Sequence, residues 1–286
     1  MKEEKIIGYI ALPENKDVNF EVGKEYNSTD HDYFENGFRV ERQLLNLIFV
    51  SDISIHKFFM VECSEIDERY KTKTSFPCKH IKVIKKYTFE DIVENIDEYR
   101  NDTVEKLVIT CNKESYGRIT NTEDNSTIFM NSVLGVVNNT GLFGIINIDG
   151  FRNTCNLANH HNIAISNGKT NRINSAGSCN TIILRGENNI LSVNGGVSNV
   201  ISNGTNSNIS CVSDSNRIIC NGENNVVYLY GENNKVKAKS GTTIIYSERN
   251  NEDKPTTVKT IHVDGTNIKA DTWYIIENEE IKECDK

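Results

Sequence analysis

The side chains that could do chemistry are scattered through this chain and do not combine into a familiar site. His160-His161 is the strongest hint of a metal ligand set. A protein metal centre needs at least a third ligand beside such a pair, so we expect these histidines to be polar corner residues. Gly168-Lys169-Thr170 ends like a phosphate-binding loop but lacks the first glycine of GxxxxGK[ST] at the required spacing.

Nucleophiles and carboxylates are equally dispersed. Serine and cysteine are plentiful, but no histidine accompanies them in a recognisable nucleophile setting. The central part of the chain holds only three aspartates, Asp124, Asp149 and Asp214. Calcium-binding nonapeptide rolls need many more carboxylates between their strands. We therefore predict no catalytic residues, no cofactor and no metal.

Charge and composition narrow the function classes further. The chain has 286 residues and a net charge of −8. By segment the charge is about −6 for residues 1–104, +2 for 105–249 and −4 for 250–286, which is typical of neither a nucleic-acid-binding nor a DNA-mimicking surface. Neither a secretory signal nor an apolar run of membrane-spanning length is recognisable. Eight scattered cysteines favour reduced thiols, so we expect a cytoplasmic protein.

The elements that must position any site come from an internal repeat of nine residues. With Gly186 as position 1, position 6 is apolar in fifteen consecutive units without insertion or deletion. The position-6 residues are Ile119, Ile128, Val137, Ile146, Cys155, Ala164, Ile173, Ile182, Leu191, Val200, Ile209, Ile218, Val227, Val236 and Ile245. Position 4 is mostly Asn and position 1 mostly Gly, so each unit predicts a short strand followed by a bend. Such strands cannot bury themselves alone and must stack into a parallel β-solenoid, with the asparagines forming ladders between coils.

The cross-section is predicted from the pattern at every third unit. Position 8 sorts into an apolar series when every third unit is taken, namely Met130, Leu157, Leu184, Cys211 and Ala238. The alternative, an eighteen-residue two-sided roll, shows no comparable sorting. We therefore predict a mainly β protein whose residues 105–249 form a right-handed, three-sided parallel β-helix with 27 residues per coil and about five coils.

Outward positions of the repeat carry more aliphatic residues than a solvated face needs. One predicted side would present Ile163, Ile165, Ile190, Ile219, Ile244 and Tyr246. Strand propensity alone explains some of these residues. Stacked exposed aliphatics form an apolar patch that monomers seldom tolerate, so we predict a docking face for self-association, a protein partner or the other domain.

The two flanks differ from the repeat. Residues 1–104 are charged, aromatic and unrepetitive, which predicts a small α+β domain with strands in KIIGYIAL, VNFEV, RQLLNLIFV, HKFFMVEC and KHIKVIKKY. A helix is predicted over 88–96, with Thr88 as N-cap and Asp91 at the third helical position. KLVITC, residues 106–111, reads as the strand that starts the solenoid. Residues 250–286 predict a short β cap of two or three strands, because open solenoid ends expose unpaired edges.

Several motifs near the amino terminus carry a family resemblance. They are GYI at 8–10, FEVGKEY at 20–26, ENGF at 35–38, FFMVE at 58–62 and KHIKVIKKYTFED at 79–91. This stretch resembles an uncharacterised small domain that precedes polar repeat arrays in low-GC bacterial and phage proteins. Members usually follow the GF with His, a residue and Cys, where this chain has Arg39 and Glu41. The motifs also look like an ADP-ribosyltransferase scaffold, although no catalytic Glu, His or Tyr can be assigned.

Together these observations predict a non-catalytic scaffold or interaction protein related to a phage or mobile element. It would bind a protein partner or a second copy through a face of the β-helix, and neither nucleic acid nor membrane. Two other hypotheses stay open: a nucleotide-binding or ADP-ribosyltransferase-like amino-terminal domain, and an oligomer that traps a small molecule between solenoids.

Overall fold

The chain folds into two compact units, residues 1–105 and 106–286. The computed structural model describes residues 5–13, 19–30, 37–44, 47, 56–72, 74–88, 91–92, 108–248, 254–255, 257–277 and 280–284. The boundary lies one residue from the predicted one, and the carboxy-terminal residues belong to the same unit as the solenoid.

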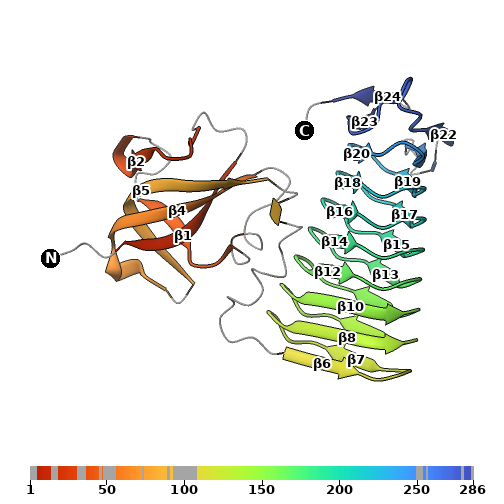
Figure 1. The fold of residues 1–286 in the computed structure, drawn as a ribbon, viewed down its shortest axis with the longest axis horizontal. Coiled ribbons are helices and arrows are strands. Elements are labelled where there is room, and N and C mark those ends of the chain that lie inside the picture. The colour runs from red at the N-terminus through yellow and green to blue at the C-terminus, as the bar shows by residue number, and fades with distance from the viewer. Residues whose placement is uncertain are drawn as a thin grey trace. The chain divides into compact units, whose positions relative to one another are not determined.

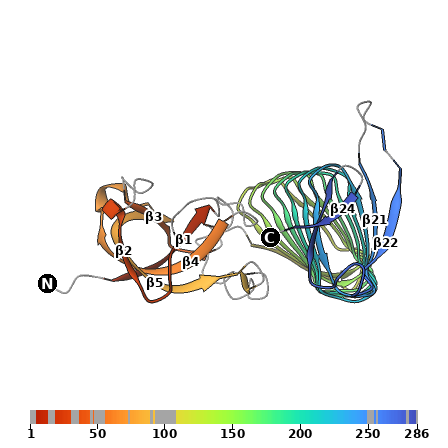
Figure 2. The same cartoon turned by 90° about the horizontal axis from the view of Figure 1, so that it is seen from above.

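The first unit is a small antiparallel barrel (Figure 2). Its strands are β1 (Ile6–Pro13), β2 (Glu25–Asn27), β3 (Phe38–Glu41), β4 (His56–Ile66) and β5 (Ser75–Tyr87). The order β2-β5-β3-β1-β4 closes through a second pairing of β5 with β4. The long β5 makes this possible, because its start pairs with β3 and most of its length pairs with β4. The closed barrel consists of β5, β3, β1 and β4, and β2 pairs with β5 outside this ring.

Alternate residues of these strands fill the barrel with apolar side chains. The core cluster comprises Ile10, Leu12, Phe20, Phe38, Val40, Phe59, Val61, Cys63, Phe76, Cys78, Ile81 and Val83. A side chain at Gly8 would overlap Val40, so the glycine of the GYI motif allows β1 and β3 to approach closely.

The predicted start of the helix after β5 is confirmed as a reciprocal cap. The Asp91 backbone N–H donates to Thr88 Oγ1 over 3.0 Å, and the Thr88 backbone N–H donates to Asp91 Oδ2 over 2.9 Å. This is a capping box, which satisfies two backbone donors of the first turn. The remainder of the predicted 88–96 helix lies almost entirely outside the described residues.

Two strand predictions in this unit are wrong over their described residues. Residues 19–22 of VNFEV form no strand, although Phe20 is buried in the barrel core. In RQLLNLIFV, Leu44 and Leu47 are helical, and the Leu47 N–H donates to the Gln43 carbonyl over 3.4 Å. Apolar runs of this length are compatible with either a strand or a buried helix, and the pattern alone does not separate them.

The second unit is a parallel β-solenoid (Figure 1). One sheet, here called sheet B, contains β6 (Val108–Asn112), β8 (Thr127–Val133), β10 (Ile145–Phe151), β12 (Ile163–Ser166), β14 (Thr181–Leu184), β16 (Asn199–Ser202), β18 (Arg217–Cys220) and β20 (Lys235–Ala238). The facing sheet C contains β7 (Arg118–Asn121), β9 (Val136–Asn139), β11 (Thr154–Leu157), β13 (Arg172–Ser175), β15 (Ile190–Val193), β17 (Asn208–Cys211), β19 (Val226–Tyr230) and β21 (Thr243–Ser247).

The coil has two sides and eighteen residues, which corrects the predicted three-sided coil of 27. Ile163 of β12 pairs with Thr181 of β14, and Arg172 of β13 pairs with Ile190 of β15. Each sheet therefore takes every second nine-residue unit, and eight such coils stack over about 34 Å at roughly 4.8 Å per layer. Position-6 and position-8 side chains of both sheets meet in one dry core.

The predicted asparagine ladder is confirmed with an eighteen-residue step. Asn171 Oδ1 accepts the Asn153 N–H over 2.8 Å, and Asn189 Oδ1 accepts the Asn171 N–H over 2.9 Å. A second ladder runs along the opposite corner, where Asn180 Oδ1 accepts the Asn162 N–H over 2.7 Å. The buried amides thus bond corner backbone groups of the adjacent coil rather than only each other.

The array ends with a one-residue slip and a confirmed cap of β-strands. Val227 of β19 pairs with Ile244 rather than Ile245, so Ile245 does not continue the inward row as predicted. The carboxy-terminal strands then run antiparallel to the solenoid: β22 (Lys259–His262) pairs with β21, and β23 (Trp273–Glu277) pairs with β20 and β24 (Glu280–Glu283). Asp264 holds the intervening turn by accepting the N–H groups of Thr266 and Asn267.

Candidate binding surface

The six residues of the predicted docking face do not form one exposed surface. Ile163, Ile165 and Ile219 share the outward side of sheet B, but all three are almost completely buried. Ile190 lies on sheet C and is 37% exposed. Because of the slip at β21, Ile244 and Tyr246 point into the solenoid core. The prediction assumed a 27-residue coil, in which the six residues share one side. In the eighteen-residue coil they belong to sheet B, to sheet C and to the core.

The thiols do not provide a nucleophile in the described solenoid core. Burial raises the pKa of Cys155 to about 12 and that of Cys220 to about 12. Burial also raises the pKa of Cys211 well above its ordinary value. In the barrel, the hydrogen bond with Cys78 and burial raise the pKa of Cys63. These four cysteines therefore stay protonated and act as core residues near neutral pH.

The histidines and aspartates singled out in the sequence serve the corners of the solenoid. His160 Nδ1 accepts the Ser178 N–H over 2.9 Å, and the His161 ring lies 5.3 Å from the Phe143 ring. Asp214 Oδ1 accepts the Glu232 N–H over 2.8 Å, one coil away. Among the described residues, no group of three His, Cys, Asp or Glu side chains is placed to hold a metal ion.

One buried carboxyl stands out in the barrel. Glu41, at the end of β3, is almost fully buried, and burial raises its pKa despite the Arg39 guanidinium 3.8 Å away. It occupies the place where the resembled family has its Cys.

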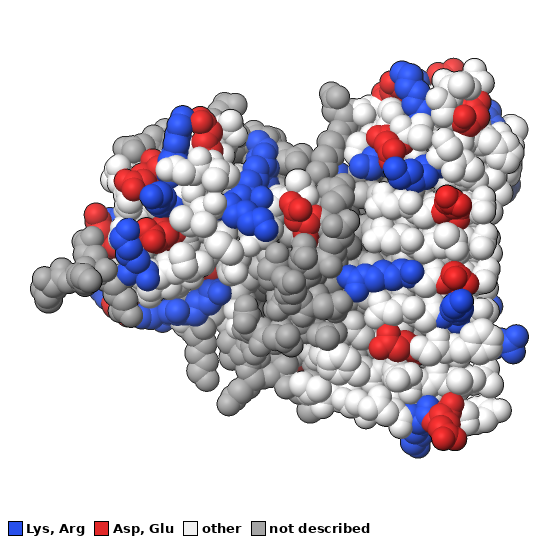
Figure 3. Space-filling model, in the orientation of Figure 1, with Lys and Arg blue, Asp and Glu red and all other residues white. Residues whose placement is uncertain are grey.

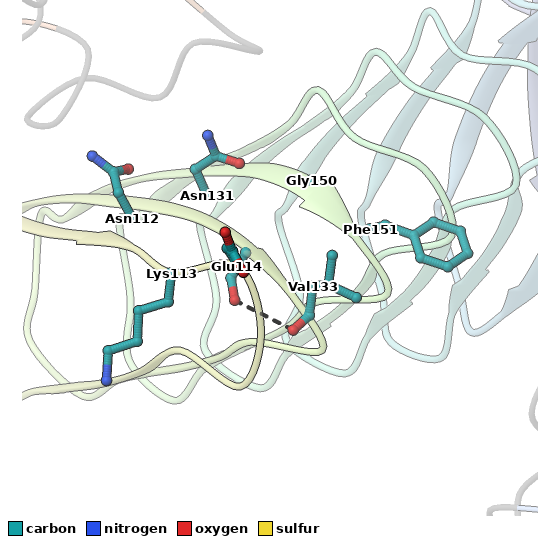
Figure 4. Close-up of a pocket in the computed structure, with 8 residues that line it drawn as sticks. Asn112, Lys113, Glu114, Asn131, Val133, Gly150 and Phe151 are labelled. Atoms are coloured by element: carbon teal, nitrogen blue, oxygen red, sulfur yellow. Dashed lines mark hydrogen bonds between the residues drawn. The ribbon is translucent and has the colours of Figure 1, made fainter.

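A shallow cavity of about 360 Å³ opens at the corner where the first three coils pass from sheet B to sheet C. Its lining residues are Asn112, Lys113, Glu114, Asn131, Ser132, Val133, Gly150 and Phe151. Figure 4 shows the Asn112 and Asn131 amides on one side and the Phe151 ring directed away from them. In an active site, polar groups point toward a common position. The polar side chains that line this cavity do not converge, so the cavity suits a contact surface better.

Beside this cavity lies the largest exposed apolar cluster of the described solenoid, here called the corner patch. It consists of Tyr116, Val133, Leu134 and Phe151, which are 73%, 37%, 42% and 38% exposed. Val133 pairs directly with Phe151 across β8 and β10. The Tyr116 N–H donates to the Val133 carbonyl over 2.8 Å and the Leu134 N–H to the Phe151 carbonyl over 3.0 Å, so the four residues are contiguous.

The backbone at this corner makes its apolar residues unexpected. Tyr116 and Leu134 have φ values of 56° and 58°, in the left-handed region. Later coils place first Arg152 and Thr170 and then Asn188, Asn206 and Asn224 at the same corner position, with φ between 55° and 57°. Asparagine tolerates this conformation far better than bulky residues do. Asparagine therefore suits this corner better than the tyrosine and leucine of the first two coils do.

Cations surround the corner patch. The Arg152 guanidinium lies 4.9 Å from the Phe151 ring centroid, and Lys113 and Arg118 are exposed nearby in the first coil. Among the described residues, Lys113, Arg118 and Arg152 make no ion pair. Glu114 is the one acidic residue among the lining residues of the cavity. The corner is thus locally positive in a chain whose net charge is −8.

Sequence reasoning missed this surface because it is formed by bends rather than strands. The recurring left-handed residue falls at position 3 of each unit, and at this corner it runs from Tyr116 and Leu134 through Arg152 and Thr170 to Asn188, Asn206 and Asn224. That change is visible in the sequence, but its meaning depends on knowing that alternate bends stack at one corner.

No family model, curated protein or solved structure matches the chain. The described residues include no helix that is long and apolar enough to cross a membrane. Uncharged residues cover much of the solenoid side seen in Figure 3.

Proposed function

We propose that this protein is a non-catalytic interaction scaffold whose solenoid presents the corner patch to a protein partner. The observation that carries the proposal is the contiguity of the exposed corner patch, in which the bulky residues Tyr116 and Leu134 are held in left-handed backbone conformations. A left-handed conformation costs an ordinary residue roughly 1–2 kcal/mol. In the free protein these exposed side chains are not stabilised by burial, so burial does not offset that cost. We therefore expect the compensating free energy to come from binding a partner.

The surroundings of the patch indicate the chemistry of the partner. An apolar contact with Lys113, Arg118 and Arg152 around it fits a protein surface with apolar side chains bordered by carboxylates. The stacked coils supply rigidity, because the backbone N–H groups of Tyr116 and Leu134 donate to carbonyls of the next coil. A preformed surface loses little conformational entropy on association.

Cytoplasmic location and a phage or mobile-element origin belong to the same proposal. Their support is the set of eight free cysteines and the family resemblance of the amino-terminal residues, respectively. The ADP-ribosyltransferase-like hypothesis makes a contrary prediction. Transfer of ADP-ribose from NAD to a target protein would replace the scaffold proposal.

The corner patch is tested by placing asparagine, which tolerates the left-handed conformation, at positions 116 and 134. In the double variant Tyr116→Asn/Leu134→Asn we expect unchanged or higher stability, by about 1 kcal/mol, because asparagine relieves the backbone cost. Affinity capture from an extract of the source cells, followed by mass spectrometry, should show loss of a partner that the wild type retains. The matched control Val197→Asn replaces an apolar residue at the opposite corner, with φ of 56° and 39% exposure, and should retain that partner. A double variant that is destabilised, or that captures the same proteins as the wild type, contradicts the proposal.

A further inference from the structure

At the amino-terminal end of the solenoid, a sheet edge is left unpaired by the strands that the structure describes. Strand β6 is the last strand of sheet B, and β7 is the last strand of sheet C at the same end. Among the described residues, no strand pairs with the outer edge of either. The opposite end is different, because antiparallel strands β22, β23 and β24 cover it.

The hydrogen-bond pattern of the coils identifies which groups of β6 face outward along that edge. At position 5 the N–H points to the preceding coil, as in Ile145 to the Ser126 carbonyl over 2.9 Å. At position 9 the N–H also points to the preceding coil, as the Asn167 N–H donates to the Ile148 carbonyl over 3.0 Å. The register of β6 with β8 gives these positions to Val108 and Asn112, with Thr110 between them. Since backbone groups alternate along a strand, Thr110 also directs its N–H and carbonyl outward.

The two ends also differ in edge protection. Natural edge strands usually carry charged residues that discourage pairing with another chain. At the capped end, β24 carries Glu280, Lys282 and Glu283, and β22 carries Lys259. The sequence of β6 is VITCN, with no charged residue, and Val108 is 59% exposed. The β6 edge therefore lacks the charged residues that would discourage pairing with another strand.

The interior side chains of β6 point to the same conclusion. Ile109 and Cys111 are only partly buried, and both pack against the solenoid core. At this end of the solenoid they are the partly buried residues of the core. A strand added at this edge would cover them with whatever inward residues it brings.

We propose that β6 pairs antiparallel with β6 of a second copy, so that two solenoids join end to end about a two-fold axis at Thr110. In this register Thr110 faces Thr110 of the second copy, and Val108 faces its Asn112. All three are residues whose backbone groups point outward, so each forms a hydrogen-bonded pair. Ile109 then faces Cys111, which covers these partly buried residues of both copies.

The second copy is the favoured occupant because the segment is self-complementary. An uncharged strand pairs with itself without like-charge repulsion, and a two-fold contact closes the assembly at a dimer. A head-to-tail chain of solenoids would instead require β6 to meet the charged strands β22 and β24. The proposal is independent of the corner patch, whose substitutions leave β6 unchanged.

The mass of the full chain in solution tests this pairing. Light scattering coupled to size-exclusion chromatography should give twice the chain mass of 32.4 kDa for the wild type. Thr110→Pro removes the outward N–H without removing a ladder bond to β8, and proline is tolerated at an edge. We expect this variant to be monomeric with an unchanged far-ultraviolet spectrum. Thr110→Val keeps the N–H and should remain dimeric.

Crosslinking provides a readout that does not depend on the proline variant folding. Facing residues of a hydrogen-bonded antiparallel pair have Cα atoms about 5.5 Å apart, within the range that a disulfide can join. Mild oxidation of Thr110→Cys should give a disulfide between the two introduced cysteines, identified by peptide mapping. The control Thr154→Cys, on the outer side of sheet C, should give none. A monomeric wild type, or crosslinking equal in both variants, overturns the proposal.

Discussion

The buried asparagine ladder offers the sharpest test of what holds the coils together. Asn171 is completely buried, and its Oδ1 accepts the Asn153 N–H over 2.8 Å. Its Nδ2 donates to Ser166 Oγ over 3.1 Å. In Asn171→Ala both bonds disappear while the backbone N–H of Asn153 remains in a dry corner.

The expected cost follows from these contacts. A buried N–H without a partner costs about 1–3 kcal/mol, and the lost bond to Ser166 adds about 1 kcal/mol. We therefore expect a loss of about 2–4 kcal/mol in the free energy of unfolding. For a unit of this size, roughly 2–4 °C per kcal/mol corresponds to a decrease in melting temperature of about 4–16 °C.

The matched control is Asn174→Ala, three residues further along the same coil. Asn174 lies on the outer side of sheet C, half-buried, and its Nδ2 donates to Asn156 Oδ1 over 2.8 Å. Water can replace that bond, so a loss of only about 0.5–1.5 kcal/mol is expected. Urea unfolding followed by far-ultraviolet circular dichroism measures both variants, with an unchanged dependence on urea concentration as the check that the folded state is comparable. Equal losses would refute the view that the inner amides, rather than polar side chains in general, hold the corners.

Two further predictions follow from the same hydrogen bonds. Ser207 occupies a ladder position between Asn189 and Asn225, so Ser207→Asn should complete the ladder and raise the free energy of unfolding by about 1 kcal/mol, and an unchanged urea midpoint would contradict this. In the capping box, hydrogen bonds from Thr88 lower the pKa of Asp91. A lowered carboxyl pKa stabilises the folded state above the unfolded pKa of about 3.9 and loses that effect as the pH falls through the folded value. Asp91→Ala should therefore cost stability at pH 7 and progressively less below about pH 4, whereas a pH-independent difference would exclude an electrostatic contribution.

The sequence determined the repeat and the local structure of each unit. Apolar residues at positions 6 and 8 predicted strands that the structure places in one core, and the asparagines at position 4 predicted the ladders. These features depend on residues within or adjacent to one nine-residue unit. Strands such as β4 and β5 were also predictable, because their apolar residues alternate with polar ones.

The number of sides required information that single units do not contain. Position 7 does carry a signal at every second unit: Ile165, Ile183 and Ile201 on sheet B alternate with Asn156, Asn174 and Ser192 on sheet C. The every-third-unit sorting at position 8 concerned inward residues, and apolar residues occur at that position on both sheets. It therefore says little about the number of sides.

Only the tertiary structure decided which outward residues are accessible and where the array departs from its register. The outward isoleucines of sheet B are buried, while Tyr116 and Leu134 at the bends are exposed. A corner that is one residue shorter before β21 turns Ile244 and Tyr246 inward. A local pattern fixes which residues share a face of one strand, but burial depends on what the rest of the chain places against that face.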